Sequence, residues 1–132
     1  MLKSMLTQTQ FLTLTDDNFQ TEVEHSLIPV VVDVWANWCM PQHRIDPIFH
    51  HLVTEFGDRI QIGCLNLATA DRIGVKYRIR AVPTLLIFSQ GKVIYRTIGA
   101  APQIEIVRQL NAQLLNSQLH LIDSSRSVIV SS

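Results

Sequence analysis

The chain has 132 residues, a length that suits one domain and excludes a second independent one. Its hydrophobic fraction of 47% is sufficient for one ordinary core, and its 11 basic and 11 acidic residues cancel. Intrinsic disorder is therefore excluded as the main state, and no surplus positive charge favours nucleic acid or an anionic membrane as a partner. The apolar stretches 27–32 and 82–88 are too short to span a bilayer, and residues 1–10 do not resemble a secretory signal. The expected location is the cytoplasm.

Apolar patterning predicts strands and helices that alternate along the chain. The β-branched run 30–35 is typical of a central strand buried on both faces, and Asp33 is the exception within it. Spacings of three and four residues predict a helix over 41–56, kinked at Pro47, and Gln90-Gly91 predicts a hairpin turn. The expected elements are a strand at 11–14, a helix from the capping residues 15–17 to His25, a strand at 30–35, a helix at 41–56, a strand at 60–67, a helix at 71–76, hairpin strands at 84–88 and 93–98, and a helix at 103–115.

This order of elements predicts an α/β fold with a mixed sheet and right-handed crossovers. The expected domain occupies residues 11–116, after an N-terminal extension of residues 1–10. The last helix is expected to end at Leu115, and the Ser-rich residues 117–132 are expected to be a flexible or appended tail.

Cys39 is the strongest candidate for chemistry because it lies where the strand 30–35 gives way to the next helix. Free N–H groups at a helix start favour thiolate over thiol, and thiolate is the nucleophile in disulfide exchange. The alternative is that Cys39 merely fills space, but a strand-to-helix junction is a place where anions bind. Cys64, in the middle of a predicted strand, is expected to be an inert buried thiol, with resolution of a Cys39 disulfide as the alternative.

Four segments between about Leu12 and Leu115 resemble the thioredoxin family. They are Leu-Thr-Asp-Asp-Asn-Phe at 14–19, Val-Asp-Val-Trp-Ala-Asn-Trp-Cys at 32–39, Lys-Tyr-Arg-Ile-Arg-Ala-Val-Pro-Thr at 76–84, and Gly-Lys at 91–92. In that family a Trp-Cys-Gly-Pro-Cys site reduces protein disulfides: the first cysteine attacks and the second resolves the mixed disulfide. The resemblance implies a thioredoxin-like fold, with a central mixed five-stranded sheet and about four helices, and it aligns Cys39 and Pro41 with the family's site.

Two positions depart from the family's site. Met40 stands where glycine is usual, and Gln42 stands where the resolving cysteine is expected. A mixed disulfide on Cys39 must then be resolved by an external thiol such as glutathione, by a second thiol of the substrate, or by Cys64. These residues predict monothiol reduction, deglutathionylation or isomerisation of protein disulfides, with no resident cofactor. The alternative is a redox-inactive module that binds a partner protein.

The resemblance also implies roles for residues around Cys39. The family's buried aspartate, which assists proton transfer, matches Asp33, but Cys64 occupies the position of the lysine that commonly pairs with it. Burial should then favour the neutral acid, which could hydrogen-bond Gln42; alternatively, Asp33 bonds only nearby hydroxyls or water. Val82-Pro83 matches the family's cis-proline loop. The expected substrate groove around Cys39, for which ordinary loop packing is the alternative, comprises Trp38, Met40, Pro41, Val82, Pro83, Gly99 and Ala100.

The five histidines do not form a recognisable metal site. His43 and His50 could share a helix face, but no carboxylate or thiol completes a ligand set at suitable spacing. We therefore expect no metal. The protein is expected to be a monomer that can form a Cys39-linked dimer on oxidation, with disulfide-bearing proteins or a binding protein as partners, a thiol as reductant, and no nucleic-acid or membrane partner.

Overall fold

Five strands form one mixed sheet in the computed structural model, which describes residues 11–36 and 47–131, with side chains as far as Leu119. The strand order is β1-β3-β2-β4-β5. The strands are β1 (Phe11–Leu14), β2 (Val30–Trp35), β3 (Gln61–Asn66), β4 (Thr84–Ser89) and β5 (Lys92–Ile98). β3 runs parallel to both β1 and β2, whereas β4 is antiparallel to β2 and to β5. The expected α/β fold with a mixed five-stranded sheet is confirmed.

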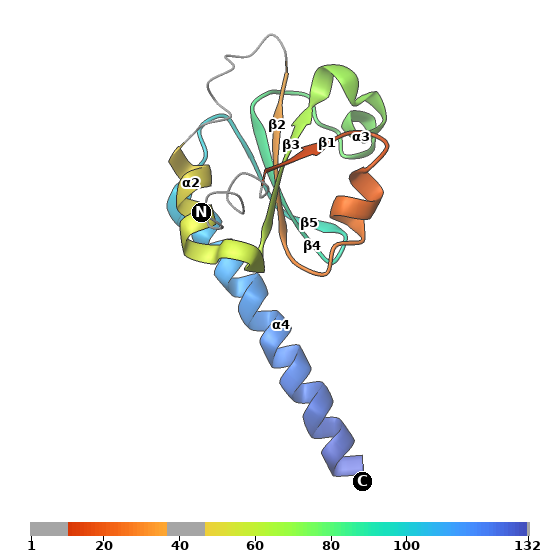
Figure 1. Cartoon of the computed structure of the whole chain (residues 1–132), viewed down its shortest axis with the longest axis vertical. Helices are drawn as coiled ribbons and strands as arrows, with labels where there is room; N and C mark the ends of the chain where they lie inside the picture. The colour runs from red at the N-terminus through yellow and green to blue at the C-terminus, as the bar shows by residue number, and fades with distance from the viewer. Residues whose placement is uncertain (1–10, 37–46, 132) are drawn as a thin grey trace, which may run out of the picture.

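Helices cover both faces of this sheet (Figure 1). On one face lie α2 (Pro47–Phe56) and α4 (Gln103–Ser131), and on the other lie the π-type turn η1 (Gln20–Glu24) and α3 (Asp71–Lys76). The short 3-10 turns η3 (Gly57–Arg59) and η4 (Leu67–Thr69) flank β3. Side chains alternate along a strand, so β2 contributes Val32 to the core under η1 and α3, and Val31 to the core under α2 and α4.

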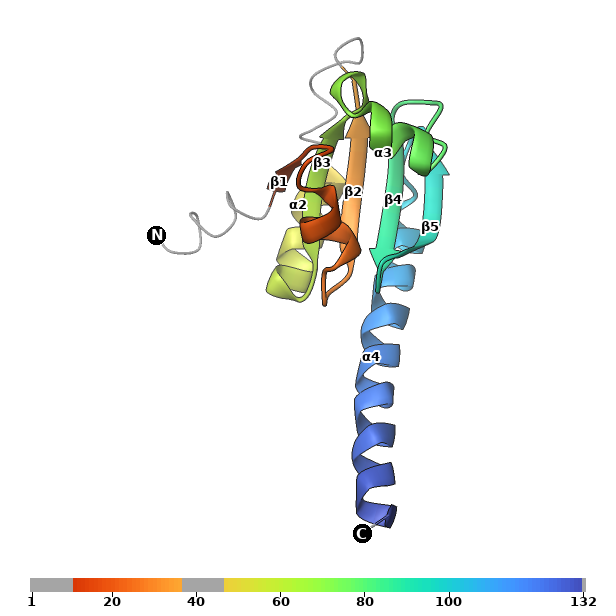
Figure 2. The ribbon, with the colours of Figure 1, turned by 90° about the vertical axis from the view of Figure 1, so that its right-hand side faces the viewer.

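Two expected helices differ from those observed. The helix expected to end at Leu115 continues to Ser131, because residues 103–131 contain neither glycine nor proline, and serine lowers helix stability only modestly (Figure 2). The helix expected up to His25 is reduced to the single turn η1. The expected helix over 41–56 is described from Pro47 onward, and its first residues lie outside the described part of the chain.

The hairpin turn between β4 and β5 has the backbone that the sequence predicts. Gln90 and Gly91 have φ angles of 54° and 79°, both in the left-handed region that a two-residue type I′ turn requires. A side chain at Gly91 would also come within 2.9 Å of the Glu24 carbonyl oxygen. Glycine is therefore needed at position 91 for two reasons, its backbone angle and its close neighbour.

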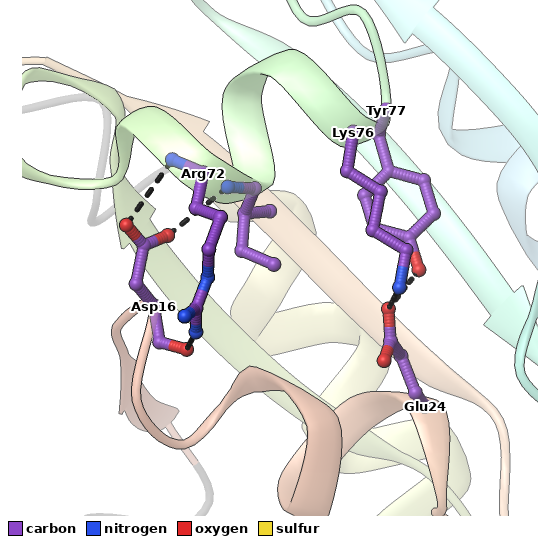
Figure 3. A network of polar contacts seen from close by, with 6 residues as sticks. Asp16, Glu24, Arg72, Lys76 and Tyr77 are labelled. Atoms are coloured by element: carbon purple, nitrogen blue, oxygen red, sulfur yellow. Dashed lines mark hydrogen bonds and ion pairs between the residues drawn. The ribbon is translucent and has the colours of Figure 1, made fainter.

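Asp16 caps the N-terminal end of α3, although it lies more than 50 residues earlier in the chain (Figure 3). Its carboxylate accepts hydrogen bonds from the backbone N–H of Ile73 (3.0 Å) and of Arg72 (3.2 Å). The Arg72 guanidinium in turn donates to the Asp16 carbonyl oxygen (2.7 Å). Asp16 was expected to help cap the helix that follows it, but it caps α3, and Thr15 performs the local role by accepting from the N–H of Asn18. Asp16 therefore joins α3 to the segment after β1.

Glu24, the last residue of η1, links η1 to the C-terminal end of α3 (Figure 3). Its carboxylate accepts hydrogen bonds from the Lys76 ammonium (2.7 Å) and from the Tyr77 hydroxyl. Burial by itself would raise the pKa of Glu24, but the hydrogen bonds from Lys76 and Tyr77 outweigh it and hold this pKa below its usual value. Burial and the neighbouring carboxylate raise the pKa of Tyr77. The carboxylate is thus held in its charged form between a cation and a neutral hydroxyl.

Replacing Asp16 should measure what its contacts with α3 contribute to stability. Asp16→Ala removes the acceptor for two N–H groups at the start of α3, and we expect it to lower the free energy of unfolding by about 1 kcal/mol, the usual cost of losing a helix cap. Urea denaturation measures this change. The control is Asp17→Ala at the exposed neighbouring position, with an expected change within about 0.5 kcal/mol. Equal losses in the two variants would contradict the capping role.

Candidate functional site

The predicted site lies at the end of the sheet where β2 ends and β4 begins. The strand register pairs Val34 with Thr84, and Thr84 with Ile98, so the chain just after β2, just before β4 and just after β5 meets at this end. The segment 37–46 follows β2 directly in the sequence. The predicted site residues Trp38, Cys39, Met40, Pro41 and Gln42 belong to that segment and lie outside the described residues.

A pocket of about 290 Å³ opens beside Asp33 on the face of the sheet that α2 and α4 cover. Four of the predicted site residues line it, although they come from three separate stretches of the chain. They are Asp33, Pro83, Gly99 and Ala100. Asp33 is only 3% exposed, so the pocket combines one buried carboxyl group with a mainly apolar lining. A carboxyl group in such surroundings is suited to proton transfer.

The loop before β4 is held in place by two hydrogen bonds. The peptide bond between Val82 and Pro83 is cis, and the Pro83 carbonyl oxygen accepts a hydrogen bond from the N–H of Gly99 (2.9 Å). The hydroxyl of the buried Thr84 donates to the carbonyl oxygen of Ala81 (2.6 Å). Val82 packs against the core under η1 and α3, whereas Pro83 lines the pocket beside Asp33. The predicted groove residues Val82 and Pro83 therefore have different surroundings.

Cys64 lies next to Asp33 on the neighbouring strand. The parallel register of β2 and β3 pairs the two residues directly, so their side chains project from the same face of the sheet. Cys64 is half-buried, whereas its mid-strand position predicted a fully buried thiol. The structure thus places a thiol beside the buried aspartate, at the position where the family resemblance implied that a lysine is missing.

The sequence comparison decides the family. The family model described as Thioredoxin matches residues 10–112. The chain belongs to the thioredoxin family. Thioredoxin C-2 of Corynebacterium nephridii is 38% identical over 92 residues, which cover 70% of this chain and 85% of that protein. The thioredoxin of Acidithiobacillus ferridurans is 37% identical over 101 residues, covering 76% of this chain and 94% of that protein. The chloroplastic M-type thioredoxin of Chlamydomonas reinhardtii is 32% identical over 112 residues, covering 85% of this chain and 80% of that protein.

Membership of the thioredoxin family supports thiol–disulfide oxidoreductase function. Proteins of the thioredoxin family generally act on protein disulfides together with a reductant. Within residues 11–36 and 47–119, whose side chains the structure describes, no three histidine, cysteine or acidic side chains gather in a way that could hold a metal ion. No helix in the described part of the chain is both long enough and apolar enough to cross a membrane.

Sequence reasoning missed part of the pocket beside Asp33. Phe49 of α2, Thr84 of β4 and Ala101 before α4 also line it. In the sequence, Phe49 is one of the apolar positions whose spacing predicts the helix over 41–56, and Ala101 carries no chemical signal. Thr84 directly follows Pro83 within the segment that resembles thioredoxin. Its position next to Pro83 was the one sequence signal that could have marked it as a residue of the pocket.

Proposed function

We propose that this thioredoxin-family protein exchanges disulfides through a single nucleophilic thiol, that of Cys39, and depends on an external thiol to complete the reaction. The supporting observation is that the family match over residues 10–112 includes both Cys39 and Gln42. By its resemblance to the family's site, the chain keeps the attacking cysteine as Cys39, and Gln42, which cannot form a disulfide, stands at the position of the resolving cysteine.

The proposed reaction begins when the Cys39 thiolate attacks one sulfur of a substrate disulfide. The sulfur–sulfur bond of the substrate breaks, the second sulfur leaves as a thiolate and takes up a proton, and a mixed disulfide with Cys39 forms. A glutathione thiolate then displaces Cys39 or the substrate from this mixed disulfide. Two glutathione molecules together supply the two electrons that reduce one protein disulfide, and they leave as glutathione disulfide. Isomerisation needs no net electrons, because a substrate thiol takes the place of glutathione.

The described half of the site suits this chemistry. The carboxyl group of Asp33 lies in a pocket with an apolar lining, where it can exchange a proton with a leaving sulfur. Val82, before the cis peptide bond, is assigned to backbone pairing with an extended segment of the substrate. Gly99 and Ala100 are assigned to the wall of the groove on the side of β5. The other wall is assigned to Trp38, Met40 and Pro41.

The reactivity of Cys39 tests the proposal. Iodoacetamide alkylation of the Cys64→Ser variant, followed against pH, should give a Cys39 pKa below the value of about 8.5 of an unperturbed cysteine. This variant should reduce a glutathionylated protein with glutathione as the only reductant, and Cys39→Ser should not. Alkylation of Cys39 no faster than that of the denatured chain at neutral pH would contradict the proposal, as would full turnover by Cys39→Ser.

A further inference from the structure

A second pocket, of about 390 Å³, lies between α3 and the segment 78–80, on the opposite face of the sheet from Asp33. It shares no lining residue with the pocket beside Asp33. Its lining is formed by Leu67, Asp71, Gly74, Val75, Arg78, Ile79 and Arg80. The volume falls within the range of small ligand sites, and the segment 78–80 leads directly into the loop that carries the cis peptide bond.

The two arginines of this pocket differ from the other arginines whose side chains the structure describes. Arg59, Arg72, Arg96 and Arg108 each donate a hydrogen bond to a protein acceptor. Arg78 and Arg80 are exposed, and neither guanidinium has an acceptor among the residues that the structure describes. Both guanidinium groups are therefore available to an anionic ligand.

Arg78 is also held in a backbone conformation that favours glycine. It follows the end of α3 with a φ of 53°, where its N–H donates to the Val75 carbonyl (3.2 Å) and the N–H of Ile79 donates to the Gly74 carbonyl (2.8 Å). The Arg96 guanidinium donates to the Arg78 carbonyl (3.2 Å) and fixes this turn from β5. An arginine here strains the backbone where glycine would not, and such strain is typical of functional positions.

We propose that this pocket binds an acidic peptide segment of the protein whose disulfide is exchanged. The lining combines two guanidinium groups with one carboxylate, that of Asp71, so it has a surplus positive charge that suits an aspartate or glutamate side chain. Val75, which is 79% exposed, provides an apolar contact for a neighbouring side chain of the same segment. Arg80 precedes Val82 by two residues, so a segment bound at the cis-proline loop can continue into the pocket. The inference rests on the proposed function only in naming this segment as part of the substrate.

A peptide without cysteine tests the pocket separately from the thiol chemistry. The probe is a fluorescent peptide of alternating leucine and glutamate, and its fluorescence anisotropy is measured with the full chain. We expect binding that weakens as the salt concentration rises, and weaker binding of the matching leucine–glutamine peptide. Equal affinity for the two peptides would overturn the proposal.

Variants with opposite expected effects locate the binding. Arg80→Gln and Arg78→Gly should each weaken binding of the glutamate peptide about three- to fivefold, and Asp71→Asn should strengthen it. Arg78→Gly should also raise the melting temperature, because it relieves the strained backbone. The matched control is Gln90→Gly, at a φ of 54° in the hairpin turn, which should raise the melting temperature without changing binding. Lys92→Gln controls for loss of one exposed positive charge.

Three further results would overturn the assignment. The first is unchanged peptide affinity in a folded Arg78→Gly/Arg80→Gln double variant. The second is equal weakening of peptide binding by Lys92→Gln and Arg80→Gln. The third is displacement of the peptide by S-methylglutathione at concentrations lower than those at which the peptide itself binds. A protein that binds the peptide but fails to exchange disulfides would contradict the proposed function and leave the peptide pocket established. Disulfide exchange without peptide binding would contradict the peptide pocket and leave the proposed function standing.

Discussion

Gln42→Cys is expected to raise the rate of protein disulfide reduction, with glutathione at millimolar concentration, by at least about tenfold. In the family's usual site the second thiol lies one helical turn after the first, on the same face, so we expect a thiol at position 42 to reach the mixed disulfide on Cys39. It would resolve that disulfide within the molecule, and reacting groups held together reach effective concentrations far above those of a free thiol. Insulin precipitation measures the rate.

Two controls separate the new thiol from other effects of the substitution. Gln42→Ser changes the same side chain without adding a thiol and should leave the rate at the level of the parent protein. Cys39→Ser/Gln42→Cys should be inactive, because the attacking thiol is gone. If Gln42→Cys is folded and shows no gain, Met40 or the replacement of a lysine by Cys64 beside Asp33 limits the reaction, and the absent resolving cysteine does not.

Phe19→Ala is expected to lower the free energy of unfolding by about 3–5 kcal/mol. The Phe19 ring is fully buried and packs against two aromatic rings, at centroid distances of 5.5 Å from Phe88 and 5.7 Å from Tyr77. The substitution removes both contacts and leaves a cavity in the core under η1 and α3. Urea denaturation followed by circular dichroism gives the change.

Phe11 offers a matched control for Phe19. It is half-buried and also makes an edge-to-face contact, with Phe49 at a centroid distance of 6.5 Å. Phe11→Ala should therefore lower the free energy of unfolding by about 1–2 kcal/mol, because folding removes less of the Phe11 side chain than of the Phe19 side chain from water. Phe19→Leu keeps most of the volume and should cost less than about 2 kcal/mol, which provides a folded variant if Phe19→Ala does not fold. A loss for Phe11→Ala as large as the loss for Phe19→Ala would contradict this account of the core.

The strands were predictable because their signals are local. The β-branched run of β2 and the Gln90-Gly91 turn each determine backbone conformation over a few residues, and both were confirmed. The contact between Asp16 and α3 was not predictable, because it joins residues more than 50 positions apart. Asp16 is also of a residue type, and at a position, typical of a cap for the helix that follows it. The end of α4 was misplaced because a serine-rich sequence without glycine or proline does not stop a helix.

The candidate site was predictable where a family pattern marked its residues. Asp33, Pro83 and Gly99 were named from the sequence, and the fold brings them to one pocket. The pocket of Arg78 and Arg80 was missed, because exposed arginines are ordinary in a sequence. Only the structure shows that these two guanidinium groups lack acceptors within the described residues and line a common cavity. Such a cavity depends on how α3 packs against the sheet, which local patterns do not encode.

The extended α4 makes this domain a candidate for oriented attachment through its C-terminal end. Leu114 still packs against the core, and the helix continues from there to Ser131, a further rise of about 25 Å at 1.5 Å per residue. It leaves the domain at the end opposite to the one where β2 stops (Figure 2). A surface, label or fused protein joined beyond Ser131 would therefore be held away from the pocket beside Asp33, and the end of the sheet with the candidate site would remain open to large substrates.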